Sequence, residues 1–318
     1  MVRYGILGAG KIARRFADSL RLEGDELYAI SGRNEEKLNA FAREHPCQKI
    51  YLSHEELIED PNIEAVYLSL PNFMHEEWAC RAMRQKKAVL CEKPAAMNES
   101  EMRKIRAVSQ QRHVLFMEAM KCRFTPAFTK AVQLLSSGTI GELKNILVQN
   151  GSVLDPVQCR DRYYMKPELG GGCLLDVGCY GVSWLQTYLG NDLQVIESQV
   201  HQSTVDLYVD ARMEGNGIGG RLICAFDTKL ESKAVFTGTG GTMEVWPMHR
   251  PDHIAIRNNE KTVELSIPYD GDDFSGEIRH FDNLLHSDTR QSDVMSLADS
   301  CACAAILDRI RASFPSPH

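Results

Sequence analysis

A short glycine-rich turn near the start of the chain constrains the fold more than any other feature. Residues 8–13 read GAGKIA, follow an apolar run and open a stretch with helical spacing. This G-x-G-x-x-A pattern is typical of dinucleotide-binding turns, in which Gly8 permits the bend and Gly10 lets the backbone approach a pyrophosphate. Since the following helix would face the phosphates with its amino-terminal end, we expect Gly8, Gly10, Lys11 and Ile12 at the cofactor. The alternative is a tight strand–helix turn without a ligand.

Apolar runs alternate with amphipathic stretches over residues 1–120, which predicts βαβ units and a parallel sheet. The expected strands are 2–7, 27–31, 49–52, 65–70, 88–91 and 114–117. The expected helices are 12–22, 35–44, 54–59, 75–86 and 99–112.

The pattern changes after Phe124, where longer runs alternate Val, Ile and Thr with polar residues. These runs indicate an open, largely antiparallel sheet with strands at 143–153, 193–205, 222–227, 233–238, 242–246, 253–257 and 262–267. Helices are expected at 126–136, 176–188, 275–286 and 293–313. The sequence therefore predicts an α/β protein with a parallel-sheet domain at 1–120 and a second α/β domain at 121–318.

Composition excludes several classes of protein. A chain of 318 residues with 43% hydrophobic and 25% charged residues is long enough for two folded domains. A net charge of −7 without a basic cluster argues against nucleic-acid binding. No apolar run has membrane-spanning length, and the first residues lack a secretory signal pattern, so we expect a cytoplasmic protein. The ten cysteines are expected to stay reduced, and their spacing predicts no metal site.

The end of the second expected strand bears on the choice of cofactor. An acidic residue here would accept hydrogen bonds from the ribose of NAD and repel a 2′-phosphate. This chain instead has Ser31 and Arg33, with Lys37 one helical turn further on. The pattern favours NADP over NAD. The alternative is that Arg33 stacks on the adenine or faces solvent and leaves both cofactors acceptable.

Two further groups of residues have the composition of catalytic sites. Glu92 and Lys93 end the fifth expected strand, at the sheet edge where open α/β sheets bind ligands. Asp176 and Tyr180 follow a run of three glycines and share one face of a helix. A tyrosine beside an ammonium group can have its pKa lowered and transfer protons. The alternatives are a salt-bridged strand end for the first pair, and a capping Asp with a buried Tyr for the second.

Together these segments resemble the Gfo/Idh/MocA family of NAD(P)-dependent oxidoreductases. The matching segments are GILGAGKIA, PNFMH, AVLCEKP, FMEAMKCRFTP, PELGGGCLLDVGCYG and FTGTGGTMEVW, in family order between residues 5 and 246. Within the family, the chain is most similar to the branch of dihydrodiol dehydrogenases and sugar 1-dehydrogenases. The resemblance implies an N-terminal Rossmann domain, followed by a substrate-binding domain whose open sheet forms a homodimer or homotetramer.

The resemblance also implies roles for individual residues. It makes Lys93 the catalytic lysine and places Asp176 and Tyr180 in the second-domain signature, with Tyr180 where many members have His. Family residues near the nicotinamide correspond to Leu70, Asn72 and His75. In the same pattern, Glu92 accompanies the lysine, and Arg123 has either a structural or a substrate-binding role.

Lys121 departs from the pattern of the dihydrodiol dehydrogenases, which have a pocket-lining Trp at this place. A cation there favours a polyol, a sugar or an anionic sugar derivative over flat aromatic dihydrodiols. The alternative is that Lys121 points to solvent and leaves the pocket unchanged. The substrate residues implied are thus Lys93, Lys121, Asp176 and Tyr180.

These observations predict transfer of a hydride between NADP, or NAD, and a secondary alcohol or hemiacetal carbon of a sugar-like substrate. Tyr180 would be the acid/base, and Lys93 would keep its pKa low. A trans-dihydrodiol dehydrogenase is the alternative within enzymes. A catalytically silent NAD(P)-binding regulator is the alternative of another class, although such a protein has no need of both Lys93 and Tyr180.

Overall fold

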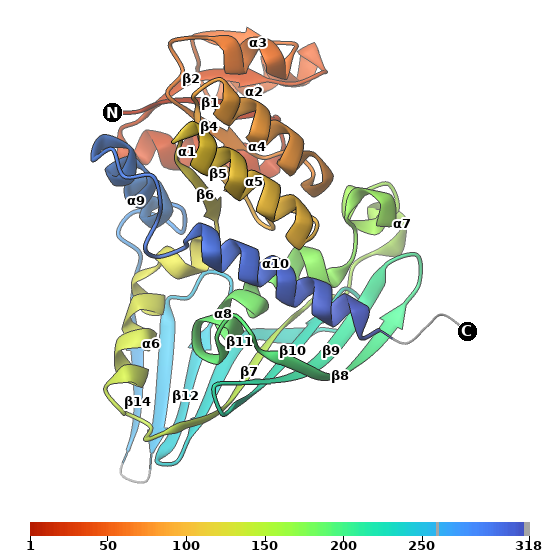
Figure 1. Cartoon of the computed structure of the whole chain (residues 1–318), viewed down its shortest axis with the longest axis vertical. Coiled ribbons are helices and arrows are strands. Elements are labelled where there is room, and N and C mark those ends of the chain that lie inside the picture. Colours follow the sequence, from red (N-terminus) through yellow and green to blue (C-terminus); the bar gives the residue numbers. More distant parts are fainter. Residues whose placement is uncertain (259–260, 315–318) are drawn as a thin grey trace. The chain divides into compact units, whose positions relative to one another are not determined.

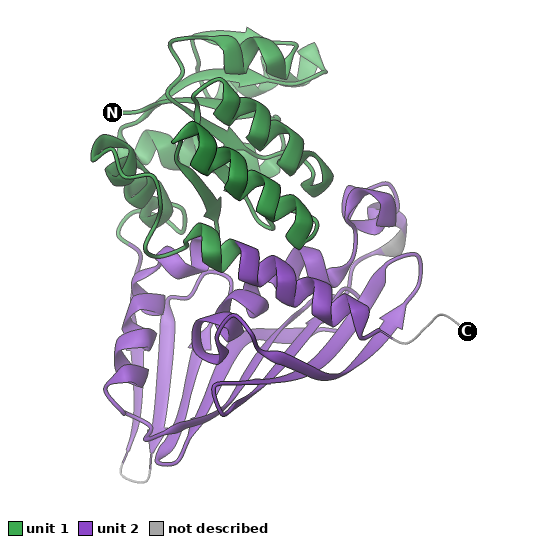
Figure 2. Ribbon diagram, viewed as in Figure 1, with its two compact units in different colours: residues 1–120, 270–300 green, residues 121–269, 301–318 purple. Residues whose placement is uncertain are grey.

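The computed structural model describes residues 1–258 and 261–314, and the chain divides into two units (Figure 2). The first unit contains residues 1–120 and 270–300, and the second contains residues 121–269 and 301–318 as far as they are described. The boundary after Met120 coincides with the expected one. Residues 270–300, which we expected in the second domain, belong to the first unit instead.

The first unit is built around a parallel sheet of six strands in the order β3-β2-β1-β4-β5-β6. Its strands are β1 (Arg3–Leu7), β2 (Glu26–Ser31), β3 (Lys49–Tyr51), β4 (Ala65–Leu68), β5 (Ala88–Glu92) and β6 (Phe116–Ala119). This is the strand order of a dinucleotide-binding Rossmann domain, in which ligands bind beyond the carboxyl ends of the two central strands. The predicted parallel sheet is confirmed.

Helices connect these strands as the sequence pattern predicts. They are α1 (Lys11–Glu23), α2 (Glu35–Glu44), α3 (His54–Glu59), α4 (His75–Arg84) and α5 (Glu99–Arg112), of which α4 and α5 lie side by side (Figure 1). Asn98 caps α5 by accepting a hydrogen bond from the Glu101 N–H at 2.9 Å. Asn34 caps α2 in the same way through the Lys37 N–H.

Residues 270–300 join the first unit because they pack on α1 and β1. The helix α9 (Ser275–His286) contacts α1, and Phe274 meets Phe16 edge to face at 6.3 Å. The Tyr4 hydroxyl donates a hydrogen bond to Asp282 Oδ1 at 2.6 Å, and the Ser19 hydroxyl donates to Asp272 at 2.5 Å. These contacts join residues more than 250 positions apart, so no local pattern could predict them.

The second unit contains a mixed sheet of eight strands in the order β14-β13-β12-β11-β7-β10-β9-β8. Its strands are β7 (Leu143–Gly151), β8 (Gln194–Gln202), β9 (Asp206–Gly215), β10 (Ile218–Ala225), β11 (Leu230–Gly238), β12 (Gly241–Trp246), β13 (His253–Asn258) and β14 (Thr262–Ser266). Among the described strands of this sheet, only the β7–β10 pair is parallel, which confirms an open, largely antiparallel sheet.

The strand β9 was absent from the expected elements. Its core side is formed by Val209, Ala211 and Met213, and charged residues alternate with them on the other side. That alternation is the period-two signal of a half-buried strand. The same side of the sheet carries a cross-strand ion pair between Arg221 on β10 and Asp210 on β9 at 2.6 Å.

Helices of the second unit pack on this sheet. The helix α6 (Pro126–Ser136) contacts β13, and α8 (Cys179–Leu189) contacts β7, β9 and β10 (Figure 1). The short helix α7 (Pro156–Cys159) follows β7 in the chain. The helix α10 (Leu297–Ala312) begins in the first unit and continues into the second. Short helical turns occur at Asn72–Met74, Lys121–Phe124, Tyr163–Met165 and Pro167–Leu169, and a π-helical segment occurs at Leu174–Gly178.

Among the described residues, no helix is both long enough and apolar enough to span a bilayer. The ten cysteines, all within the described residues, form no disulfide, and Cys301 and Cys303 are buried in α10. The residues described in the structure form no group of His, Cys, Asp or Glu that could hold a metal ion.

Candidate functional site

The turn between β1 and α1 has the geometry of a phosphate cradle. Gly8 has a positive φ of 97°, and its N–H donates to Ser31 O at 3.0 Å, which holds the turn against the end of β2. A Cβ at Gly8 would lie 3.2 Å from Leu70 Cδ2, so this position needs glycine. A Cβ at Gly10 would meet no atom within 4 Å. Gly10 therefore leaves open space at the amino-terminal end of α1, where an anionic group is stabilised.

Asn72 lies in the loop that follows β4, the strand beside β1. Its side chain is only 3% exposed, yet its amide nitrogen has no hydrogen-bond partner among the described residues. Leaving a buried donor unsatisfied costs about 1–3 kcal/mol, so such a group commonly belongs to a ligand site. The cradle and this amide nitrogen both fit a dinucleotide at the carboxyl edge of the sheet.

His75 is buried near the same carboxyl edge of the parallel sheet. Its Nδ1 is 2.9 Å from Pro94 O, its Nε2 is 2.8 Å from Leu70 O, and the ring is fully buried. Burial lowers the pKa of His75 below its ordinary value. The ring therefore connects the loop after β4 to the loop after β5. We expected His75 to contact the cofactor, but both of its ring nitrogens face backbone carbonyl oxygens instead.

Glu92 and Lys93 stand at the end of β5. The Glu92 carboxylate is buried and accepts hydrogen bonds from the Tyr67 hydroxyl and, at 3.3 Å, from the Lys93 N–H. The Lys93 side chain is half-buried, and its peptide bond to Pro94 is cis. The hydrogen bond from Tyr67 thus holds the Glu92 carboxylate in place, and the carboxylate in turn holds the backbone N–H of Lys93.

The residues expected to select the cofactor have different surroundings. Ser31 is fully buried, and its hydroxyl lies 2.7 Å from Nδ1 of His54, whose pKa is lowered by burial. Arg33 and Lys37 are exposed, as is Lys11 in the neighbouring turn. Within the described part of the chain, none of these three cations forms an ion pair, and all three follow β1 or β2.

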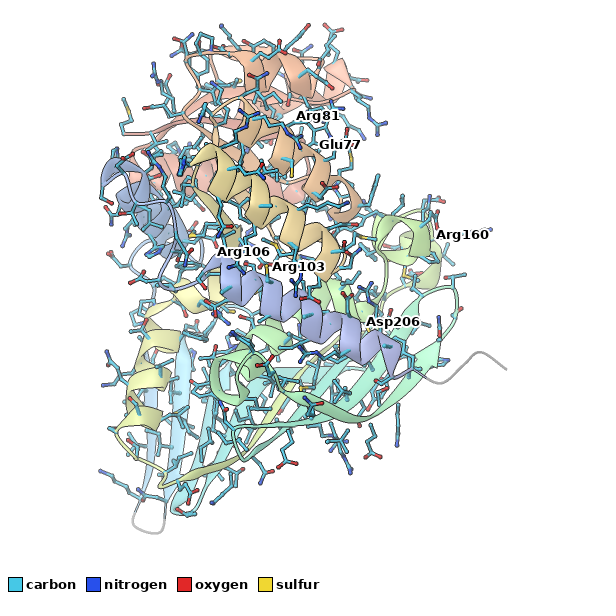
Figure 3. All side chains as sticks on the ribbon, viewed as in Figure 1. Glu77, Arg81, Arg103, Arg106, Arg160 and Asp206 are labelled. Atoms are coloured by element: carbon cyan, nitrogen blue, oxygen red, sulfur yellow. The ribbon has the colours of Figure 1, made fainter. Side chains whose placement is uncertain are left out.

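In the second unit, a buried carboxylate supports the segment that carries Asp176. Asp206, at the start of β9 and labelled in Figure 3, accepts the Leu174 N–H at 2.7 Å. Gly172 has a φ of 115°, and a Cβ there would collide with Asp206. Burial raises the pKa of Asp206 above its ordinary value. The glycine run therefore brings the π-helical segment directly onto β9, a support that sequence analysis missed.

Asp176 and Tyr180 lie on either side of the junction between the π-helical segment and α8. Asp176 is half-buried, and Tyr180 is 7% exposed in the first turn of α8. Short π-helical segments occur frequently at functional sites. Residues 176–188 are helical throughout, as expected. The expectation of a regular α-helix is wrong for the first turn, which belongs to the π-helical segment.

Lys121 and Arg123 lie in the turn that opens the second unit. Lys121 is only 6% exposed, so the alternative in which it points to solvent is wrong. Arg123 donates from Nε to the Ser183 hydroxyl at 2.7 Å, from a terminal nitrogen to Ser183 O at 3.0 Å, and to Gln186. Its guanidinium therefore binds α8 one turn after Tyr180.

His249 was not among the expected residues. It lies between β12 and β13, half-buried, with its ring centroid 5.9 Å from that of Tyr180. No motif marks the MHRP segment that contains it, so only the fold could reveal this neighbour.

Comparison with known proteins identifies the family. Residues 2–120 match the oxidoreductase family with an NAD-binding Rossmann fold, and residues 128–244 match the GFO/IDH/MocA C-terminal domain. The chain is 30% identical over 321 residues to trans-1,2-dihydrobenzene-1,2-diol dehydrogenase of Xenopus laevis, covering 96% of each chain. The human enzyme of that name is 29% identical, with 98% of this chain and 96% of the human one covered. This chain belongs to the Gfo/Idh/MocA family, and it is an oxidoreductase that uses NAD or NADP.

Solved structures share the fold. A 3-ketoreductase from Actinomadura kijaniata, crystallised with NADP and TDP-benzene, has a TM-score of 0.90 and 24% identity, with 98% of both chains covered. Levoglucosan dehydrogenase, in complex with NADH and levoglucosan, has a TM-score of 0.88 and 19% identity, covering 98% of this chain and 96% of the other. The fold of this chain is therefore shared with these two oxidoreductases.

Proposed function

We propose that this enzyme oxidises or reduces a secondary alcohol or hemiacetal carbon of a sugar-like or polyol substrate with NADP. The observation that carries the proposal is the open cradle at Gly10 together with the buried, unpartnered amide nitrogen of Asn72. In this proposal, residues 1–120 hold the cofactor, and the second unit binds the substrate and forms a homodimer or homotetramer.

Several residues of the first unit would hold the dinucleotide. Gly8, Gly10, Lys11 and Ile12 would receive the pyrophosphate at the start of α1, since a helix amino terminus stabilises anions. Leu70 and Asn72 would lie beside the nicotinamide, with His75 and Glu92 fixing the loops beneath it. A bound nicotinamide would supply the acceptor or the donor of the hydride that is exchanged with the substrate carbon.

The adenosine end would be selected by the cations after β1 and β2. Arg33 and Lys37 are exposed, and they are free to approach a 2′-phosphate, whereas Ser31 is buried and supports the turn through His54. Charge-assisted hydrogen bonds between a guanidinium and a phosphate are strong and directional. This arrangement favours NADP over NAD.

The acid/base of the reaction would be Tyr180. Its phenol oxygen takes the hydroxyl proton of the substrate during oxidation and returns a proton during reduction. In this proposal the Lys93 ammonium would lower the pKa of the phenol, because a positive charge beside a phenol favours the phenolate. Asp176 would orient a neighbouring substrate hydroxyl. General acid–base catalysis of this kind contributes roughly 10²- to 10⁴-fold.

The class of substrate follows from Lys121. This cation is buried at the start of the second unit, where dihydrodiol dehydrogenases have a pocket-lining aromatic residue. A cation in place of that aromatic residue favours a polyol, a sugar or an anionic sugar derivative over a flat aromatic ring. A trans-dihydrodiol is the second candidate substrate, because the full-length relatives at about 30% identity are named for that activity.

A substrate panel separates the candidates. NADP and NAD are each offered with aldoses, polyols, a levoglucosan-type anhydrosugar and a trans-dihydrodiol, and turnover is followed by cofactor absorbance. We expect the highest kcat/KM with a sugar or polyol and NADP. Preference for the dihydrodiol would support the second candidate. Cofactor binding without any turnover would instead favour a catalytically silent regulator.

The role of Tyr180 is tested separately. The Tyr180→Phe variant should lose roughly 10²- to 10⁴-fold in turnover while its affinity for NADPH is unchanged, because only the proton-transferring oxygen is removed. Tyr188→Phe is a matched control on the same helix. Turnover of Tyr180→Phe near that of the wild type would remove Tyr180 from the mechanism.

A further inference from the structure

The loop after β12 is fixed along the helix that carries Tyr180. Trp184 follows Tyr180 by four residues on α8, so the two side chains project from the same face. The indole N–H of Trp184 donates to Met248 O at 2.8 Å, and both residues are fully buried. The next residue of the loop is therefore held opposite the first turn of α8.

A second anchor comes from β11. The Ser232 hydroxyl accepts the Met248 N–H at 3.2 Å and lies 3.1 Å from Nδ1 of His249. The Met248 N–H also approaches Ser232 O at 3.2 Å. The imidazole is thus oriented from the side of the sheet, and its plane is tilted by 58° to the Tyr180 ring at a centroid distance of 5.9 Å.

We propose that His249 is a positioning residue that holds the phenol ring of Tyr180 in its working orientation, an inference that rests on the proposed role of Tyr180. Trp184 and Met248 are buried in the core, and their packing does not require a histidine at position 249. The ring of His249 lies against the ring of Tyr180 and is itself held by Ser232, so it can fix the position of the phenol. Catalytic groups must be held within about 0.5 Å of the productive geometry, and a 1 Å displacement can cost about 10²-fold.

The variants separate the imidazole ring from its anchor. His249→Ala removes both the ring and the anchor, His249→Phe keeps an aromatic ring against Tyr180, and Ser232→Ala removes the hydroxyl only. His253→Phe is the matched control, because His253 also stacks on an aromatic ring, Trp246, at 5.5 Å and is paired with Asp252.

Kinetics give the first measurement. We expect His249→Ala to lower kcat by roughly tenfold or more with the affinity for NADPH unchanged, because the phenol loses its orientation. Phe should recover most of that loss, Ser232→Ala should lose less than His249→Ala, and His253→Phe should match the wild type. Wild-type kcat for His249→Ala, or a loss that Phe does not restore, would overturn the proposal.

A spectroscopic measurement is independent of turnover. The NMR signal of ring-labelled Tyr180 is assigned by its disappearance in Tyr180→Phe. In His249→Ala it should shift or broaden while the other tyrosine signals stay in place, and an unmoved signal would overturn the proposal. This result does not depend on whether any sugar is a substrate, so it is separate from a failure of the proposed function. If His249→Ala does not fold, His249→Phe and Ser232→Ala decide the matter by the same two measurements.

Discussion

Replacement of Gly10 by alanine separates cofactor binding from folding. Gly10 has an extended backbone that any residue adopts, with φ −81° and ψ −176°, and an added Cβ would touch nothing within 4 Å. Alanine is a poorer helix N-cap than glycine, which lowers the free energy of unfolding. It also lowers the conformational entropy of the unfolded chain, which stabilises the folded state by about 0.4–1 kcal/mol. The two effects nearly cancel, so the melting temperature should hardly change.

The affinity for NADPH should fall in the same variant. The new methyl group occupies the place where the backbone would approach the pyrophosphate, and overpacking of this kind costs about 1–3 kcal/mol. That penalty corresponds to a Kd raised by roughly 5- to 150-fold. Isothermal titration with NADPH and a thermal melt of the same sample measure the two quantities.

Gly8→Ala is the matched control for this experiment. Its positive φ of 97° and the 3.2 Å approach of Leu70 Cδ2 make alanine strained there, at a cost of about 1–3 kcal/mol in folding. Its melting temperature should therefore fall, unlike that of Gly10→Ala. If Gly10→Ala binds NADPH like the wild type, or melts as early as Gly8→Ala, the cradle at α1 is not the cofactor site.

Two further predictions concern charge. Arg33→Ala should raise the KM for NADP by roughly tenfold or more and leave the KM for NAD unchanged, since a charged hydrogen bond contributes about 1.5–3 kcal/mol. The control variant Arg43→Ala, on α2, should change neither KM. Equal effects of Arg33→Ala on both cofactors would contradict the selection of NADP by Arg33. Burial, reinforced by Asp25, raises the folded pKa of Asp282 from 3.8 to about 8, so its contribution to stability is fully present below pH 3.8 and is lost as the pH rises towards 8. Asp282→Asn, which stays neutral, should therefore gain about 2 kcal/mol relative to the wild type between pH 5 and pH 8, after allowance for solvent access. Denaturant unfolding at both pH values measures the difference, and parallel stability curves would show that Asp282 is ionised throughout.

The fold of the first 120 residues could be predicted closely because its signals are local. Every strand there except the short edge strand β3 is largely buried. Each helix has an apolar face, and caps such as Asn34 and Asn98 stand directly before the helices that they begin. The parallel sheet then follows from the alternation of strands and helices.

Other features depend on contacts that no local pattern carries. The return of 270–300 to the first unit rests on pairs such as Tyr4 with Asp282, which are 278 residues apart in the chain. The place of His249 depends on the hydrogen bond between Trp184 and Met248, 64 residues apart. Sequence patterns therefore indicated candidate groups for the chemistry, whereas the residues that support them became visible only in three dimensions.

A double-mutant cycle on Lys93 and Tyr180 tests the central claim most directly. Turnover of Lys93→Met, Tyr180→Phe and the double variant is compared with the wild type on the best substrate of the panel. If the ammonium acts through the phenol, removing it from an enzyme that already lacks the phenol oxygen costs little, and the double variant should be about as slow as the slower single variant. If the two losses multiply, the residues act independently, and Lys93 does not activate Tyr180.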